Sequence, residues 1–276
     1  MFEEKMETEA IPERVLSLCQ LLAKGSMQED EVRKCVEPVS MNQGRSTYFK
    51  KVYDAANQLG LVGENDDTKE LSLLVEKNIV GSHVDLKKYI VKHIEKLIFG
   101  QFYKTTQLYI EKSEELFAVD KELQNISKLA DKLNEMYMNE NGDELKLRNE
   151  NMLAWRFWAT YLGFGYLHGM FFLPNVAMYL KTCIECSSIE PDRVYTMSEF
   201  VHELHPYINI CISSFREEKR TLNMALSNGF RTLHDLGIIE LKYENDRQDE
   251  WNLTSMELHK FSSLVTDCIY KEKRYI

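Results

Sequence analysis

Proline and glycine are scarce in this 276-residue sequence, which contains five prolines and 12 glycines. An all-β sandwich needs frequent turns, which these residues favour, so their scarcity argues against that class. Large-scale disorder is also excluded, because 44% of the residues are hydrophobic and 11% are aromatic. The composition therefore predicts a mainly α fold with small β-hairpins.

Basic residues are also in short supply. The chain has 34 Lys and Arg against 44 Asp and Glu, which gives a formal net charge of −10. A protein that coats nucleic acid without sequence preference needs a surplus of positive charge, and this chain lacks one. Two classes stay open: a DNA reader with its basic residues on one helix, and a subunit that docks onto a basic protein.

Recognisable catalytic and targeting motifs are absent from the sequence. It contains no nuclease, kinase, protease or NTPase signature, so we expect a protein that is not an enzyme and needs no cofactor. Residues 1–14 are acidic and lack the apolar region of a signal peptide. The six cysteines are scattered, which is typical of a reduced, cytoplasmic protein.

The most apolar stretch of the chain, residues 157–180, contains no Asp, Glu, Lys or Arg. Its length is sufficient for a membrane span. Three glycines, His168 and Pro174 interrupt it, so we expect no span. The sequence instead predicts a buried helix with Trp155 and Trp158 at its start and a turn at residues 173–175. This helix would form the core between the two flanking segments.

The first module, residues 1–80, is predicted to be a winged helix-turn-helix. Apolar residues at helical spacing indicate helices from residue 11, over 28–36 and over 46–59, and residues 61–75 indicate a β-hairpin. The third helix of such a module can enter the major groove of DNA. The predicted DNA contacts near the start of this helix are Arg45, Ser46, Thr47, Lys50 and Lys51. The alternative is a solvated helix face, because winged helices also bind proteins.

A helical core domain and a second winged helix-turn-helix module complete the predicted architecture. Residues 81–195 carry helical apolar stripes that would pack on the uncharged stretch. Residues 196–276 indicate helices over 198–210 and 221–236, strands over 238–243 and 250–253, and a closing amphipathic helix over 256–270. A shift of 177 residues places Gly237 on Gly60. The second helix offers only Arg231 to DNA, so we expect this module to hold the fold or a partner.

Several residues approach known chemical motifs without matching them. Zinc-like spacing is found in the set Cys183, Cys186, His202 and His205, but the gap between the two histidines is too short. We expect buried cysteines and surface histidines there, without a metal. His168 has no accompanying nucleophile or paired carboxylate, so a satisfied core histidine is preferred to a catalytic base. Gly163, Gly165 and Gly169 lack the spacing of a nucleotide-binding loop, and close helix packing explains them better.

The order of these segments resembles a known family. The residues that carry the resemblance are AWRFWATYLGFG and FFLPN in the middle, and LSNGFRTLHDLGIIELKYEN followed four residues later by EWNL. They are similar to DpdG-type proteins of bacterial defence clusters linked to 7-deazaguanine DNA modification. The resemblance implies an accessory subunit that works beside ATPase or nuclease partners encoded with it, and it supplies no catalytic residues.

The leading hypothesis is therefore a non-enzymatic subunit that binds or senses double-stranded DNA in a prokaryotic antiviral defence complex. The alternative is a tandem winged-helix scaffold without direct DNA contact, similar to the accessory subunits of SMC-type ATPase complexes. A third hypothesis is a transcriptional regulator, which would be a symmetric dimer on a palindromic site.

Overall fold

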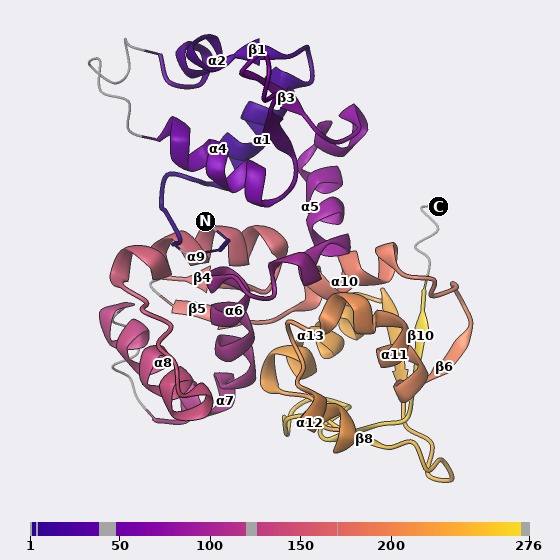
Figure 1. The fold of residues 1–276 in the computed structure, drawn as a ribbon. Helices are drawn as coiled ribbons and strands as arrows, with labels where there is room; N and C mark the ends of the chain where they lie inside the picture. Colours follow the sequence, from indigo (N-terminus) through magenta and orange to yellow (C-terminus); the bar gives the residue numbers. More distant parts are fainter. Residues whose placement is uncertain (1, 4, 39–47, 120–125, 170, 272–276) are drawn as a thin grey trace.

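The computed structural model describes residues 2–3, 5–38, 48–119, 126–169 and 171–271 (Figure 1). Helices form the larger part of this structure and the strands form small sheets, which confirms the mainly α prediction. In the described part of the chain, no helix is both long and apolar enough to cross a membrane. Figure 1 shows an N-terminal unit at the top, joined through α5 (His83–Lys92) to helices at the lower left and a C-terminal unit at the lower right.

The N-terminal unit packs helices against a three-stranded antiparallel sheet of order β1-β3-β2. Its elements are α1 (Pro12–Leu22), β1 (Met27–Gln28), α2 (Glu29–Val36), α4 (Phe49–Gln58), β2 (Val62–Glu64) and β3 (Glu70–Leu73). Apolar residues at helical spacing turn one face of α4 into the core, where Phe49, Val52 and Ala56 are buried.

The C-terminal unit is built around a second three-stranded antiparallel sheet, of order β6-β10-β7. Its elements are α10 (Ala177–Cys186), β6 (Val194–Thr196), α11 (Met197–Ile208), α12 (Ser214–Glu218), α13 (Met224–Asp235), β7 (Ile239–Lys242) and β10 (Asp267–Tyr270). A separate antiparallel pair, β8 (Trp251–Asn252) and β9 (Leu264–Val265), lies in the segment between β7 and β10.

The two sheets share their strand order and their register. Val62 of β2 is paired with Leu73 of β3, and Ile239 of β7 is paired in the same way with Tyr270 of β10. The first strand of each unit also pairs with the last strand in a matching register. The sequence between β7 and β10 is longer, yet the extra residues leave the pairing unchanged.

The 177-residue repeat is confirmed where α4 and α13 end. Gly60 and Gly237 both adopt the left-handed conformation, with φ of 68° and 66°, which favours glycine. The Gly60 amide donates to the carbonyl of Asn57 at 2.8 Å, and the Gly237 amide donates to that of His234 at 2.9 Å. The structural repeat includes α10 and β6, so it begins upstream of residue 196.

Helices and one hairpin fill the middle of the chain. They are η1 (Lys77–Val80), η2 (Ile94–Leu97), α6 (Gln101–Glu111), α7 (Ser113–Val119), α8 (Ile126–Asn141), α9 (Asn149–Leu162), β4 (Gly165–His168) and β5 (Phe171–Pro174). Trp155 and Trp158 of α9 are fully buried. Trp155 donates from Nε1 to Thr106 Oγ1 at 2.9 Å, so its polar atom is satisfied inside the core.

The prediction that a buried helix continues to residue 173 is wrong. The helix ends at Leu162, and β4 and β5 form an antiparallel hairpin instead. A Cβ atom on Gly163 would lie 2.7 Å from the Tyr179 amide, and one on Gly165 would lie 2.2 Å from the Leu173 carbonyl oxygen. Both glycines therefore permit close backbone approaches at the helix end and within the hairpin.

A closing helix over residues 256–270 is also wrong. This segment contains β9 and β10, and β10 is the central strand of the second sheet. Asp267, Cys268 and Ile269 are consecutive and all buried. A strand that is covered on both faces has no alternation of polar and apolar residues, so periodicity does not distinguish it from a short helix. The strand expected over 250–253 is β8, which pairs with β9 rather than with β7.

Residues 2–3 and 5–10 attach the N-terminal unit to the middle of the chain. The ring of Phe2 is buried between Phe102 and Trp158, with ring centroids 5.4 and 4.8 Å away. Trp158 Nε1 donates to the carbonyl of Ala10 at 2.6 Å. A Cβ atom on Gly100 would lie 1.8 Å from the Phe2 carbonyl oxygen, so only glycine allows this segment to lie so close.

Candidate functional site

The predicted contact surface on α4 is only partly open. Lys50 is exposed and forms no ion pair with the described residues. Lys51 is partly buried, and its Nζ lies 3.1 Å from Glu7 and 2.6 Å from Glu9. Arg45, Ser46 and Thr47 lie outside the described residues. The structure therefore places one of the five predicted contacts on an open surface and one inside an ion-pair cluster.

Electrostatics strengthen the cluster around Lys51. The hydrogen bond to Glu9 raises the pKa of Lys51 above its usual value. Burial alone would raise the pKa of Glu9, but the hydrogen bond from Lys51 holds it below the ordinary range. Lys51 is therefore charged and already neutralised within the chain at neutral pH, so a phosphate would have to displace both glutamates.

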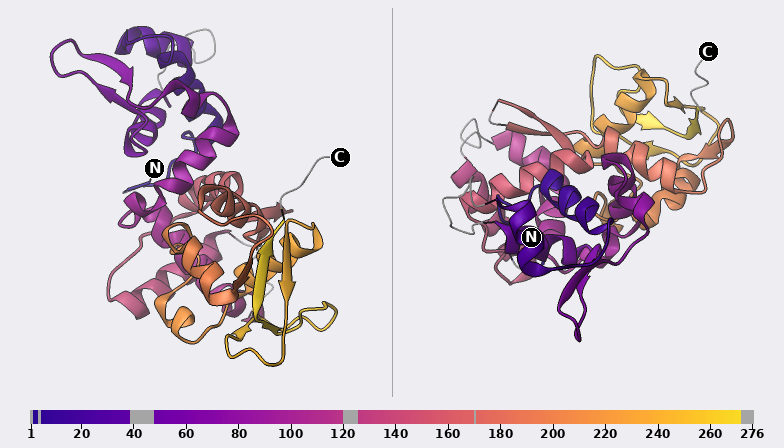
Figure 2. Two further views of the ribbon diagram at one scale, coloured as in Figure 1. Left: turned by 90° about the vertical axis from the view of Figure 1, so that its right-hand side faces the viewer. Right: turned by 90° about the horizontal axis from the view of Figure 1, so that it is seen from above.

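The hairpin formed by β2 and β3 carries a strongly acidic tip. It projects away from the body in both views of Figure 2. Its charged side chains are Glu64, Asp66, Asp67, Lys69 and Glu70. The only lysine of this tip, Lys69, is itself 3.1 Å from Glu64. Asn65 shapes the turn by accepting hydrogen bonds from the amides of Asp67 and Thr68.

The corresponding helix of the second unit, α13, is enclosed by the protein. It packs against α10, β7, α6, α7 and β5. Gly229 allows the close approach to α10, because a Cβ atom there would lie 2.9 Å from Val176 Cγ2. Arg216 Nε of α12 donates to Glu111 Oε1 of α6 at 2.7 Å and holds the unit in this position. This helix cannot enter a DNA groove in the observed fold.

Arg231, the basic residue of α13, is buried and serves the fold. Its guanidinium donates to the backbone carbonyls of Phe261 at 2.8 Å, Thr254 at 2.7 Å and Ser262 at 2.8 Å. Burial lowers the pKa of Arg231, and these carbonyls supply the compensating partial charge. The result fits the expectation that the second module holds the fold rather than DNA.

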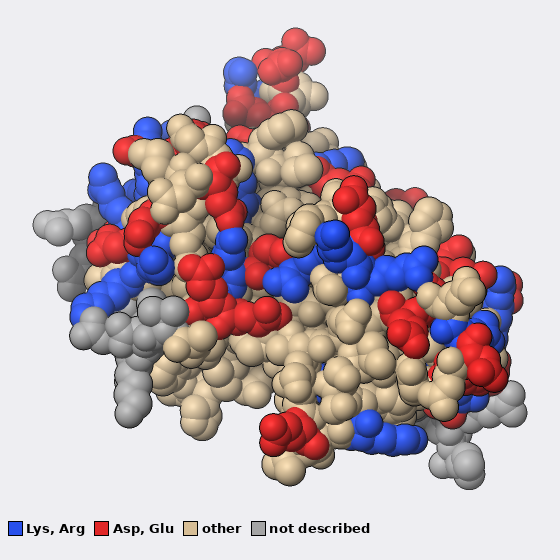
Figure 3. All heavy atoms as spheres, turned by 90° about the horizontal axis from the view of Figure 1, so that it is seen from below, with Lys and Arg blue, Asp and Glu red and all other residues tan. Residues whose placement is uncertain are grey.

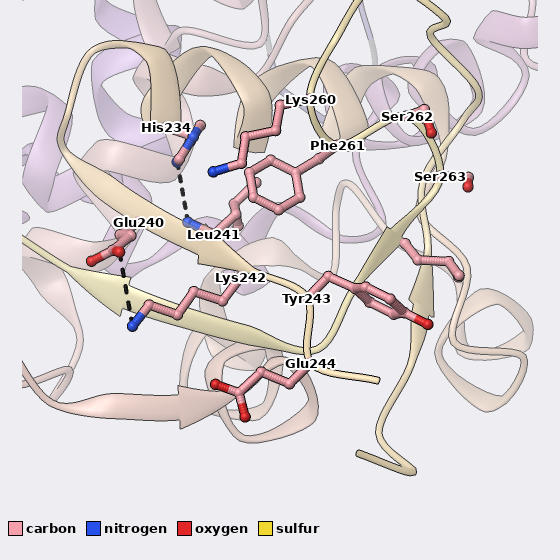
Figure 4. Close-up of a pocket in the computed structure, with 11 residues that line it drawn as sticks. His234, Glu240, Leu241, Lys242, Tyr243, Glu244, Lys260, Phe261, Ser262 and Ser263 are labelled. Carbon is pink, nitrogen blue, oxygen red and sulfur yellow. Dashed lines mark hydrogen bonds and ion pairs between the residues drawn. The ribbon is translucent and has the colours of Figure 1, made fainter. Parts of the chain in front are cut away.

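A groove of about 560 Å³ lies beside β7, the edge strand of the second sheet, and is covered by residues 260–264 (Figure 4). Charged side chains of both signs line it: Glu240, Glu244, Lys242 and Lys260. The amide of Leu241 donates to His234 Nδ1 at 3.2 Å, so the imidazole satisfies an outward-facing donor of the strand. Because the charges balance, the groove does not favour a ligand of either sign.

The residues with zinc-like spacing lie in different environments. Cys183 is buried in α10, and burial raises the pKa of its thiol well above the usual value. His202 and His205 are exposed on α11, and His205 Nε2 lies 3.5 Å from Glu217. Among the described residues, no group of three or more potential ligands is placed to hold a metal ion.

His168 is exposed at the end of β4, so the interpretation as a core histidine is wrong. It lies beside the hairpin turn, where Gly169 adopts a φ of 59°. The uncharged stretch was expected to be helical at this point, and the hairpin instead carries the side chain into solvent. Close packing explains Gly163 and Gly165, but a Cβ atom on Gly169 would meet open space.

Sequence reasoning missed the partners of the basic residues. Glu9 is 42 positions away from Lys51, and the carbonyls that bind Arg231 are 23 to 31 positions away. No local spacing indicates contacts of this kind. The chain matches no family model, no curated protein and no solved structure.

Proposed function

We propose that both units are winged helix-turn-helix modules, with α4 and α13 as third helices and the β2–β3 and β7–β10 segments as wings. The support is the common order of elements and the common register of the two sheets. The first module presents its wing to solvent, whereas the second uses its third helix for internal packing. Under this proposal the modules have divided the roles of binding and support.

The protein acts as a non-enzymatic cytoplasmic subunit that binds a partner protein through the first module. The acidic tip of the β2–β3 hairpin carries this conclusion, because it contains four carboxylates, at Glu64, Asp66, Asp67 and Glu70, and only one lysine. A DNA backbone would repel such a tip, while a basic protein surface would attract it. The chemistry fits an ATPase or nuclease subunit encoded beside this protein, with a basic surface patch.

Charge reversal at the tip tests this function. Each protein encoded next to this chain would be co-expressed with it, and affinity would be measured for any pair that co-purifies. The variant Asp66→Lys/Asp67→Lys is expected to weaken binding about tenfold or more, with a lower association rate. The control Asp143→Lys/Glu144→Lys makes the same charge change in the exposed loop between α8 and α9 and should leave affinity unchanged. Equal affinities for all three proteins would overturn the proposal.

Direct DNA binding is the second candidate, and the exposed ammonium of Lys50 at the start of α4 favours it. Arg45, Ser46 and Thr47 precede it in sequence and would complete the contact. Fluorescence anisotropy with duplex DNA over a salt series is the test, using the wild type and Lys50→Glu/Lys51→Glu. Tight, salt-sensitive binding that the variant loses would establish this candidate. No binding by the wild type at low salt would reject it.

Figure 3 illustrates why charge decides between the two candidates. On the face that it shows, a short band of Lys and Arg crosses the middle, and Asp and Glu lie around it and over much of the rest. Nonspecific DNA binding draws on several phosphate contacts at once. A surface with mixed charge fits a protein partner, whose own charges can alternate in a complementary pattern.

A further inference from the structure

A cavity of about 320 Å³ lies where α5, α9 and α10 meet α1. Its size is within the range of small-molecule sites. The rim is apolar, with Val84 of α5 and Met178 of α10 both exposed to solvent. Tyr161 of α9 forms one wall, and its hydroxyl donates to the carbonyl of His83 at 2.9 Å. The cavity therefore offers an apolar mouth and a fixed aromatic wall.

Three lysines line this cavity, and they are unequally neutralised. Lys88 Nζ lies 2.9 Å from Glu185, and Lys181 binds the other oxygen of the same carboxylate. Lys87 forms no ion pair with any described residue, and its Nζ lies 5.5 Å from the centre of the Tyr161 ring. Glu185 therefore pairs with the ammonium groups of Lys88 and Lys181, whereas the ammonium group of Lys87 is available to a ligand in the cavity.

Desolvation marks Lys87 as the ammonium group that its surroundings neutralise least. Burial lowers the pKa of Lys87, the neighbouring charge of Lys181 lowers it further, and the charge of Glu185 offsets this only in part. A second carboxylate, Glu13 of α1, and the imidazole of His83 also line the cavity. Glu185 differs: burial would raise its pKa, but hydrogen bonds from Lys181 and Lys88 keep it below the usual value. A partly buried ammonium next to another ammonium is stabilised by any anion that enters the cavity.

We infer that this cavity binds a small organic anion in which a phosphate or carboxylate group is joined to an apolar or aromatic body. The anionic group would contact Lys87, with Lys181 close by, and the apolar body would pack against Tyr161, Met178 and Val84. The inference is independent of the proposed partner binding, because the cavity lies away from the β2–β3 hairpin. It assigns a ligand site at the junction of the two units and the central helices.

Isothermal titration calorimetry with phenyl phosphate, benzoate, inorganic phosphate and phenol tests the inference. Phenyl phosphate or benzoate is expected to bind more tightly than both inorganic phosphate and phenol, because only the first two combine charge with an aromatic body. The stronger of the pair identifies the anionic group. If phenol or inorganic phosphate binds as tightly as both, the two-part site does not exist.

Two variants assign the binding to this cavity. Lys87→Met keeps the unbranched side chain except for its terminal ammonium, so it removes the charge and should weaken binding about tenfold, as expected for a charge-assisted hydrogen bond. Met178→Glu adds a carboxylate at an exposed rim position and should also weaken binding, without disturbing the core. Lys92→Met, an exposed change further along α5, is the matched control and should bind as the wild type does.

Proton linkage gives a readout that a merely structural lysine would not change. At a pH close to the lowered pKa of Lys87, anion binding should raise that pKa and cause proton uptake, measured as heats that depend on the ionisation enthalpy of the buffer. Lys87→Met should abolish this uptake. Unchanged affinity and unchanged uptake in Lys87→Met and Met178→Glu would overturn the inference.

Discussion

Replacement of Arg231 by methionine should destabilise the protein by about 2–3 kcal/mol. Each hydrogen bond from a charged donor contributes about 1.5–3 kcal/mol, and Arg231 makes three to the carbonyls of Thr254, Phe261 and Ser262. Two effects reduce the sum. Ser262 is exposed, so water can reach its carbonyl once the guanidinium is removed. The variant also avoids the unfavourable free energy of burying a charge.

Urea unfolding followed by far-UV circular dichroism measures this loss. The control is Arg193→Met, because Arg193 is exposed and lies 3.9 Å from Glu190, a surface pair that contributes little. Limited proteolysis should also become faster within residues 254–262 in Arg231→Met alone. A change in unfolding free energy below about 0.5 kcal/mol, equal to that of the control, would refute the structural role of Arg231. The guanidinium would then be free to contact a ligand.

Two further changes test other contacts. Gly100→Ala should push the Phe2 segment out of its site, because the added Cβ would lie 1.8 Å from a carbonyl oxygen; amide exchange should show lost protection at Gln101, whose N–H donates to Glu3. Burial lowers the pKa of His234, which Asp235 offsets only in part, so the unfolded chain binds more protons near pH 6. Stability should therefore fall as the pH decreases from 7 through about 6.5 towards that lowered pKa, and His234→Asn should remove this dependence while still accepting from the Leu241 amide. An unprotected Gln101 in the wild type, or an identical pH profile in His234→Asn, would contradict the respective prediction.

The sequence predicted the elements with strong helical periodicity and clear end signals. The spacing of Phe49, Val52 and Ala56 indicated α4, and Gly60 marked its end. The recurrence of a Leu-Gly pair at Gly60 and Gly237 indicates the repeat from the sequence alone. These signals are local, so a single chain contains all of the information needed.

Two different patterns of burial defeated the prediction elsewhere. Asp267, Cys268 and Ile269 of β10 are consecutive and all buried, so that strand has no alternating periodicity. The β4–β5 hairpin instead exposes apolar side chains such as Tyr166 and Leu167, so its apolar run did not distinguish a hairpin from a buried helix. The environment of Lys51 could not be predicted for a different reason. Counting lysines on α4 cannot show that Glu7 and Glu9 neutralise Lys51, because the fold brings these distant residues together. The cavity beside Lys87 was equally hidden, since Lys181 comes from another helix.

The longer connection between β7 and β10 has a consequence for the order of folding. The pairing of Val62 with Leu73 closes a segment of 11 residues, whereas that of Ile239 with Tyr270 closes one of 31. The larger loop costs about 1 kcal/mol more in chain entropy, and no contact in the finished sheet reflects this difference. The N-terminal sheet should therefore form first, both in refolding and during synthesis. It would already be folded when β10 pairs with β6 and β7.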